Sequence, residues 1–215
     1  MREFAVVQYH LFGLSLQEPI ALFYNWLIFV LCMIWVSKLK PVNEAVKNWR
    51  WFFILFGIAC LFGGFAHSLY QYFGNVGKIP QWILGIVSGF FAGKAMWSLL
   101  PDSNKFKRFL FIFLWLKMIV NLTLCLSFMS FTFVTIDSIL TYFIYAGGIG
   151  FYLYKKGQKE LRYFFIAVLC CLPAAFIFLL KIDLSKYFNR EDLSHVFILL
   201  CLIFFHIGTK KLMKR

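Results

Sequence analysis

Long apolar stretches alternate with short polar ones along almost the whole chain. Several are about 20 residues long, which is the length that a helix needs to cross the hydrocarbon core of a bilayer. Glu18-Pro19 is a suitable start for the first of these helices, and residues 1–18 are too polar to span. The pattern predicts an all-α fold, a single membrane domain (1–215) with seven transmembrane helices at 19–37, 51–73, 80–100, 109–129, 131–154, 163–180 and 191–208.

The composition excludes an ordinary soluble domain. Hydrophobic residues make up 62% of the chain and charged residues only 14%, whereas soluble domains carry about 25% charged residues. The mean hydropathy is +0.78. The net charge of +13 does not indicate nucleic-acid binding, because the basic residues are confined almost entirely to the short loops between apolar stretches. The expected partner is therefore membrane lipid.

The distribution of positive charge predicts an orientation. Seven spans place alternate loops on opposite sides, and 15 of the 22 Lys and Arg residues then lie on one side and 5 on the other. Because cytoplasmic loops carry the excess of positive charge, the N-terminus is expected outside and the C-terminus in the cytoplasm. The compact loops and the Phe/Ile/Lys bias suggest a bacterial inner membrane.

Three polar side chains interrupt the last apolar stretch. Glu191, His195 and His206 fall within about 60° of one another on a helix. Ionisable groups at membrane depth are costly and mark a functional site by default. His206 lies about 16 Å deeper than His195 along the helix, so we expect it to serve a separate role, as a hydrogen-bond partner near the cytoplasmic end.

His67, in the second stretch, completes the candidate site. It lies about 9 Å below the outer end of its helix, and His195 lies about 8 Å below the outer end of a helix that runs the opposite way. Glu191 is one turn above His195 on the same face. Two imidazoles and a carboxylate with an open fourth position form a catalytic zinc site, which activates water and polarises a carbonyl. The sequence therefore predicts zinc ligands His67, His195 and Glu191, with Asp192 as a general base.

Other interpretations of these residues remain open. Asn189 is a suitable N-cap, and Glu191 and Asp192 would then lie in the first turn, where acidic groups favour the helix dipole. Two histidines at one depth could also ligate haem in a b-type cytochrome. A small-solute transporter is a third possibility, for which the dipeptide Pro80-Gln81 is weak support.

Features outside this site are expected to be structural. Gly85, Gly89 and Gly93 recur at the spacing that lets helices approach closely in lipid. Lys117 and Asp137 stand in neighbouring apolar stretches and are expected to form a salt bridge. The six cysteines lie inside predicted spans without metal-binding spacing, and we expect them to be buried packing residues.

The combination of seven helices with these histidines resembles the alkaline ceramidase and progestin/adipoQ receptor superfamily of membrane hydrolases. The resemblance is carried by His67 near the end of the second helix and by two motifs of the seventh, Ser194-His195-Val196-Phe197 and Phe205-His206-Ile207-Gly208. In that superfamily the seventh helix opens with two ligand histidines four residues apart, and Glu191 stands at the place of the first. The resemblance implies zinc-dependent hydrolysis of a lipid amide or ester.

Two positions depart from the superfamily pattern. Gly63 stands where its members have a serine four residues before the histidine, and Ser68, on the far side of His67, is the nearest hydroxyl and the candidate for the catalytic serine. Gln81 stands where they have an aspartate at the start of the third helix. The chain is therefore expected to be a diverged member. A catalytically inactive seven-helix protein remains an alternative to the hydrolase.

Overall fold

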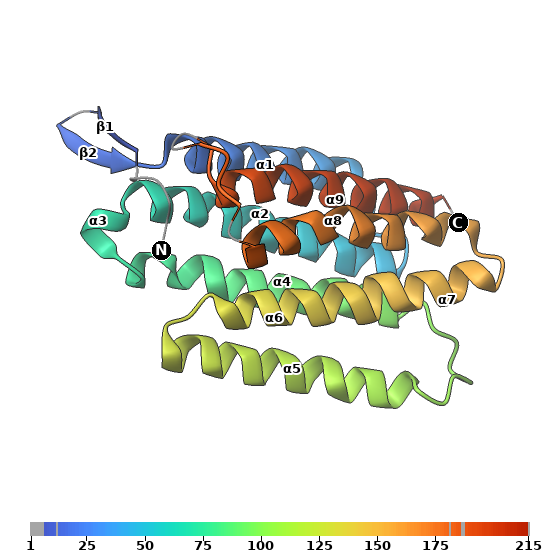
Figure 1. Ribbon diagram of the computed structural model, residues 1–215. Helices are drawn as coiled ribbons and strands as arrows, with labels where there is room; N and C mark the ends of the chain where they lie inside the picture. The colour runs from blue at the N-terminus through green and yellow to red at the C-terminus, as the bar shows by residue number, and fades with distance from the viewer. Residues whose placement is uncertain (1–6, 12, 181, 186–187, 215) are drawn as a thin grey trace.

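The protein is a bundle of long helices that lie side by side (Figure 1). The computed structural model describes residues 7–11, 13–180, 182–185 and 188–214. Its long helices are α1 (Pro19–Lys38), α2 (Glu44–Ser68), α4 (Ile79–Trp97), α5 (Lys107–Phe128), α8 (Arg162–Leu180) and α9 (Arg190–Met213). One further continuous helical segment consists of α6 (Thr132–Leu140), the π-helical η2 (Thr141–Ile149) and α7 (Gly150–Lys155). Short elements are α3 (Tyr70–Phe73), η1 (Val76–Lys78) and η3 (Lys159–Leu161).

Each of the seven stretches expected to be helical is helical, with the largest difference in the second. The prediction of 51–73 is shifted, because α2 starts at Glu44, where the Asn43 side chain accepts a hydrogen bond from the Val46 amide at 2.9 Å and caps the helix. The helix ends at Ser68, and Leu69 separates it from α3. The polar linker therefore contributes almost two turns to this helix.

Five helical segments in the described part of the chain are long and apolar enough to cross a membrane. These are α1, α2, α5, the continuous segment Thr132–Lys155 and α9. Most outward side chains of α5 are apolar, and Phe109, Ile112 and Leu116 among them are exposed. Such a surface suits lipid and would be unfavourable in water. The chain thus has the character of a helical membrane protein.

A small β-hairpin precedes the first helix and was not expected from the sequence. Strands β1 (Gln8–Leu11) and β2 (Leu14–Gln17) pair antiparallel, and Gly13 in the turn has a φ of +78°, which glycine adopts without strain. The described part of the fold is therefore not purely helical. The Ser15 amide donates to the hydroxyl of Tyr72 at 3.2 Å and so ties the hairpin to α3.

The core is formed where α2 packs between α1 and α4, and where α8 packs against α9. Trp49 on α2 is fully buried and packs on Phe164 of α8 and Phe205 of α9, with ring centroids 5.1 Å and 4.8 Å apart. Small residues permit the close approaches. A Cβ atom added at Gly208 would lie 2.8 Å from the ring of Phe164, so α9 can approach α8 only without a side chain there.

The predicted glycine packing is found at two of the three positions on α4. A Cβ atom at Gly93 would lie 2.5 Å from Leu114, and one at Gly89 would lie 2.9 Å from the Asp137 carboxylate. At Gly85 the nearest atom, on Val134, would be 3.5 Å away, an ordinary contact. Gly93 therefore allows α5 to approach α4 closely, and Gly89 does the same for α6.

The predicted salt bridge between α5 and α6 is present. Lys117 Nζ lies 2.7 Å from an Asp137 carboxylate oxygen, and both side chains are 1% exposed. Thr141 Oγ1 lies 3.5 Å from the other carboxylate oxygen. The pair is buried against Gly89, where η2 begins.

Candidate metal centre

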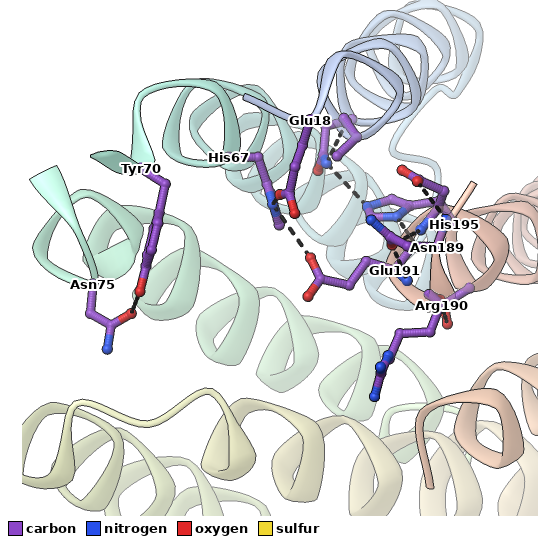
Figure 2. Close-up of polar contacts among 12 residues, drawn as sticks. Glu18, His67, Tyr70, Asn75, Asn189, Arg190, Glu191 and His195 are labelled. Atoms are coloured by element: carbon purple, nitrogen blue, oxygen red, sulfur yellow. Dashed lines mark hydrogen bonds and ion pairs between the residues drawn. The ribbon is translucent and has the colours of Figure 1, made fainter. Parts of the chain in front are cut away.

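Three ionisable side chains from three helices meet at one end of the bundle. They are Glu18 at the start of α1, His67 in the last turn of α2 and Glu191 in the first turn of α9. One ligand atom from each lies within 4.8 Å of the other two. His67 Nδ1 is 2.6 Å from Glu18 Oε2 and 3.5 Å from Glu191 Oε2. Figure 2 shows both carboxylates directed towards the imidazole.

Glu18 enters the site through an unusual backbone conformation. Its φ of +52° and ψ of +61° are left-handed, a region that costs a non-glycine residue of order 1 kcal/mol. Its amide donates to the Val7 carbonyl at 3.1 Å, and Pro19 then starts α1. The chain therefore turns sharply between the hairpin and α1, and the Glu18 side chain is directed to His67. The sequence marked Glu18 only as a helix start.

The first turn of α9 combines a helix cap with a site residue. The Asn189 side chain accepts hydrogen bonds from the amides of Glu191 and Asp192 at 2.7 Å and 3.2 Å, and Asp192 Oδ2 accepts from the Asn189 amide at 3.1 Å. This is a capping box. Asn189 and Asp192 provide the cap, while the Glu191 side chain reaches towards His67. The predicted cap is thus confirmed for Asn189 and Asp192, and in the same turn the Glu191 carboxylate lies 3.5 Å from His67 Nδ1.

The structure places His195 beside this cluster and not in it. Its Nδ1 lies 2.6 Å from the backbone oxygen of Glu191, and its Nε2 lies 3.1 Å from Asn25 Nδ2 on α1. The ring also stacks on Tyr24, with centroids 6.3 Å apart. Both ring nitrogens thus have protein partners. Of the three ligands predicted from the sequence, His67 and Glu191 come together, and Glu18 occupies the third place instead of His195.

The physical reason lies in the carbonyl group one turn before His195. A backbone oxygen can only accept, so His195 Nδ1 carries the proton. This hydrogen bond holds the imidazole ring against its own helix. Nothing in the sequence spacing reveals this local bond. The same contacts do not favour haem ligation, because neither nitrogen of His195 is directed to a space shared with His67.

Asp192 and Ser68, the predicted catalytic residues, are both buried. Asp192 is 2% exposed, and its Oδ1 has no hydrogen-bond partner among the described residues. Its carboxylate is close enough to interact electrostatically with Glu18, Glu191 and His67. Ser68 follows His67 at the end of α2; it is 3% exposed, and its Oγ also lacks a partner in the part of the chain that the structure describes. Asp192 therefore borders the cluster, and Ser68 is a buried hydroxyl next to it in the chain.

The two positions that depart from the superfamily pattern lie against each other. A Cβ atom at Gly63 would be 2.7 Å from Gln81 Nε2 and 2.9 Å from Asn25 Oδ1. The Gln81 amide thus occupies the space that a serine side chain would need. Asn25 links this place to His195. Sequence reasoning named Gly63 and Gln81 separately and did not show that one makes room for the other.

The donor set at the centre suits a divalent metal ion. Imidazole and carboxylate groups are common zinc ligands, at about 2.0–2.2 Å, and the unpartnered Asp192 oxygen offers an acceptor beside them. The short contact between His67 and Glu18 holds a proton, which a metal ion would replace. Glutamate side chains are flexible enough to adjust to a bound ion. Glu18, His67 and Glu191 are therefore the residues that would hold it.

His206 lies apart from the site, as the spacing predicts. It stacks on Trp35 of α1, with ring centroids 5.0 Å apart and planes at 12°. Its Nδ1 is buried without a hydrogen-bond partner in the described chain. The predicted hydrogen bond is therefore absent among these residues, and the ring takes part in aromatic packing.

Fold and site together define a helical membrane protein with a candidate metal centre at one end of its bundle. The chain belongs to a family of unknown function, DUF6962, whose model matches residues 20–214. The match includes His67 and Glu191. No curated protein and no solved structure matches the chain.

Proposed function

We propose that this protein is a zinc-dependent membrane hydrolase that acts on an amide or ester bond of a membrane lipid. In this proposal Glu18, His67 and Glu191 hold the metal ion, and the chain is a diverged member of the alkaline ceramidase and progestin/adipoQ receptor superfamily. The observation that carries the proposal is the meeting of these three side chains at one end of the bundle, where Glu18 and His67 are buried and Glu191 is partly buried.

The proposal includes a seven-span topology in a bacterial inner membrane. The seven spans are α1, α2, α4, α5, the segment Thr132–Lys155, α8 and α9, with the N-terminus outside and the C-terminus in the cytoplasm. The distribution of Lys and Arg over alternate loops supports this orientation. The metal centre then lies at the outer end of the bundle, within reach of lipid headgroups in the outer leaflet.

The protein's own groups have distinct roles in this chemistry. A bound zinc ion would polarise the scissile carbonyl and acidify a water molecule. His67 and the two glutamates fix its position. Asp192, with one buried carboxylate oxygen that lacks a partner among the described residues, accepts the proton of the attacking water. The Asn189 amide holds the other oxygen and so orients the carboxylate.

An activity assay on the reconstituted protein tests this function. Fatty-acid release is measured from a panel of lipid amides and esters, before and after removal of metal by a chelator and again after addition of zinc. We expect release that is lost with the metal and restored by zinc. The His67→Gln variant should lose activity by about 100-fold or more, because changing even the neighbours of metal ligands costs 10- to 100-fold.

The matched control is His206→Gln, which also alters a partly buried histidine of the bundle but leaves the centre intact. It should retain most of the activity. No release from any amide or ester by the zinc-loaded protein, or equal release by wild type and His67→Gln, would contradict the hydrolase.

A further inference from the structure

A second polar place lies deeper in the bundle, at Asn25, Gly63 and Gln81. Gly63 stands four residues before His67 on α2, which is one turn or about 6 Å along the helix. Asn25 is 1% exposed, whereas Gln81 is half-buried. This place is thus close enough to the metal centre for a single lipid headgroup to reach both.

The hydrogen bonds around Asn25 fix the orientation of its amide. The backbone oxygen of Glu191 only accepts, so His195 Nδ1 carries the proton and His195 Nε2 accepts from Asn25 Nδ2 at 3.1 Å. The Ala21 carbonyl also accepts from Asn25 Nδ2, at 2.8 Å. Both amide hydrogens of Asn25 are therefore used, and Oδ1 must point the other way.

That oxygen has no hydrogen-bond partner among the described residues, although it is buried. A buried acceptor without a donor costs about 1–3 kcal/mol, so such atoms call for an explanation. Asn25 Oδ1 is directed to the place beside Gly63 where Gln81 Nε2 also lies. An acceptor and a donor therefore lie together beside Gly63, and the donor is at the flexible end of a long side chain.

We propose that Asn25 and Gln81 form a recognition subsite for a hydrogen-bond donor of a lipid headgroup, either an amide N–H or a hydroxyl. Asn25 Oδ1 accepts the ligand's hydrogen, and Gln81 Nε2 donates to the ligand's oxygen. Gly63 is required because any side chain there would displace Gln81. The subsite rests on the proposed function only in taking a lipid as its ligand.

Paired probes that differ by a single donor test the subsite. Decanoic N-methylamide is compared with its N,N-dimethylamide, and decanol with decyl methyl ether, by calorimetric titration of the full-length protein in detergent. The wild type should bind at least one donor-bearing probe about 10- to 100-fold more tightly than its partner. The pair that shows the difference identifies the donor as N–H or O–H.

Variants then assign the preference to Asn25. Asn25→Leu should bind both members of each pair equally. Asn121→Leu is the matched control, since Asn121 is also buried and also donates to the carbonyl four residues earlier, but on α5. It should keep the preference. Gln81→Leu should weaken the donor-bearing probes about 2- to 10-fold.

Equal affinity within both pairs for the wild type, or no binding of any probe, overturns the subsite, and this comparison does not depend on any variant folding. A preference that survives in Asn25→Leu also overturns it. Binding is measured without hydrolysis and alongside the zinc content. If the protein prefers the donor-bearing probe but contains no zinc, only the proposed hydrolase is contradicted. If it contains zinc but binds both members of each pair equally, only the subsite is contradicted.

Discussion

His67 Nδ1 lies 2.6 Å from Glu18 Oε2, although 49 residues separate them in the chain. Nδ1 is the donor in this bond, so the Glu18 carboxylate fixes both the tautomer and the orientation of the imidazole. The segment before the first long helix is therefore part of the site. A metal ion bound here must take the place of the proton between the two groups.

This relationship predicts that the zinc affinity depends on pH. Zinc bound at His67 Nδ1 displaces the proton that this nitrogen donates to Glu18, and a neutral imidazole then carries that proton on Nε2. The affinity should fall as the pH is lowered, because protons then compete with zinc for the imidazole and the carboxylates. Calorimetric titrations at several pH values measure this dependence. A zinc affinity that does not change with pH would place the metal elsewhere.

The close contact of α8 with α9 predicts a stability effect at Gly208. In Gly208→Ala the new methyl group would lie 2.8 Å from the Phe164 ring, which is packed on Trp49 and cannot easily move. Overpacking of this kind costs about 1–3 kcal/mol. The midpoint of thermal unfolding in detergent should fall accordingly.

Gly85→Ala is the matched control for this prediction. A Cβ atom there would lie 3.5 Å from Val134, and alanine favours the helix by up to about 1 kcal/mol over glycine. Its stability should equal or exceed that of the wild type. Equal midpoints of thermal unfolding for Gly208→Ala and Gly85→Ala would contradict the close approach of α9 to Phe164.

The buried pair of Lys117 and Asp137 predicts a non-additive pattern. Lys117→Met or Asp137→Leu alone leaves one buried charge without its partner, at a cost of about 3–5 kcal/mol. The double variant removes both charges, and it should be markedly more stable than either single variant. Denaturant unfolding of all four proteins measures the cycle. Single variants as stable as the wild type would contradict a buried ion pair.

The loop between α4 and α5 should respond to acid. Lys107 Nζ donates to Asp102 at 2.8 Å, and this hydrogen bond lowers the pKa of Asp102 below its usual 3.8. The contact therefore adds stability above the unfolded-state pKa and loses it as the pH falls through the lowered value. Because Asp102 is exposed, the effect is small and weakened by salt.

An NMR titration of Asp102 measures this shift. In Lys107→Met the midpoint should rise towards 3.8, because the donor is gone. The α4–α5 loop of the wild type should also loosen as the pH falls through the lowered midpoint, whereas the loop of the variant should show no such step. An identical midpoint in both proteins would show that Lys107 does not hold Asp102 in solution.

Hydrophobic patterning predicted the helical stretches well, because an apolar run of about 20 residues has few alternatives to a membrane helix. It placed the second helix poorly, since the cap at Asn43 lies in a polar linker that hydropathy alone does not assign to a helix. It also missed the hairpin before α1. That element is short, and Gly13 and its contact with Tyr72 define it, rather than a long alternating pattern.

The candidate site was predicted only in part. Helical depth and the antiparallel arrangement correctly brought His67 near the start of α9. The same reasoning could not find Glu18, because its side chain reaches the site through a left-handed backbone residue at the end of the hairpin. It also could not foresee that His195 bonds to the Glu191 carbonyl of its own helix. The sequence signal that could have identified Glu18 as a site residue was its position: it is an acidic residue directly before Pro19, at the start of an apolar stretch.

The metal content of the purified protein tests the central claim most directly. Elemental analysis of the wild type should show about one zinc ion per chain, which is lost in Glu18→Gln, His67→Gln and Glu191→Gln. His195→Gln should retain most of it. The exposed Glu44→Gln serves as the matched carboxylate control and should retain all of it. A metal-free wild type, or zinc lost in His195→Gln but kept in Glu18→Gln, would contradict a centre formed by Glu18, His67 and Glu191.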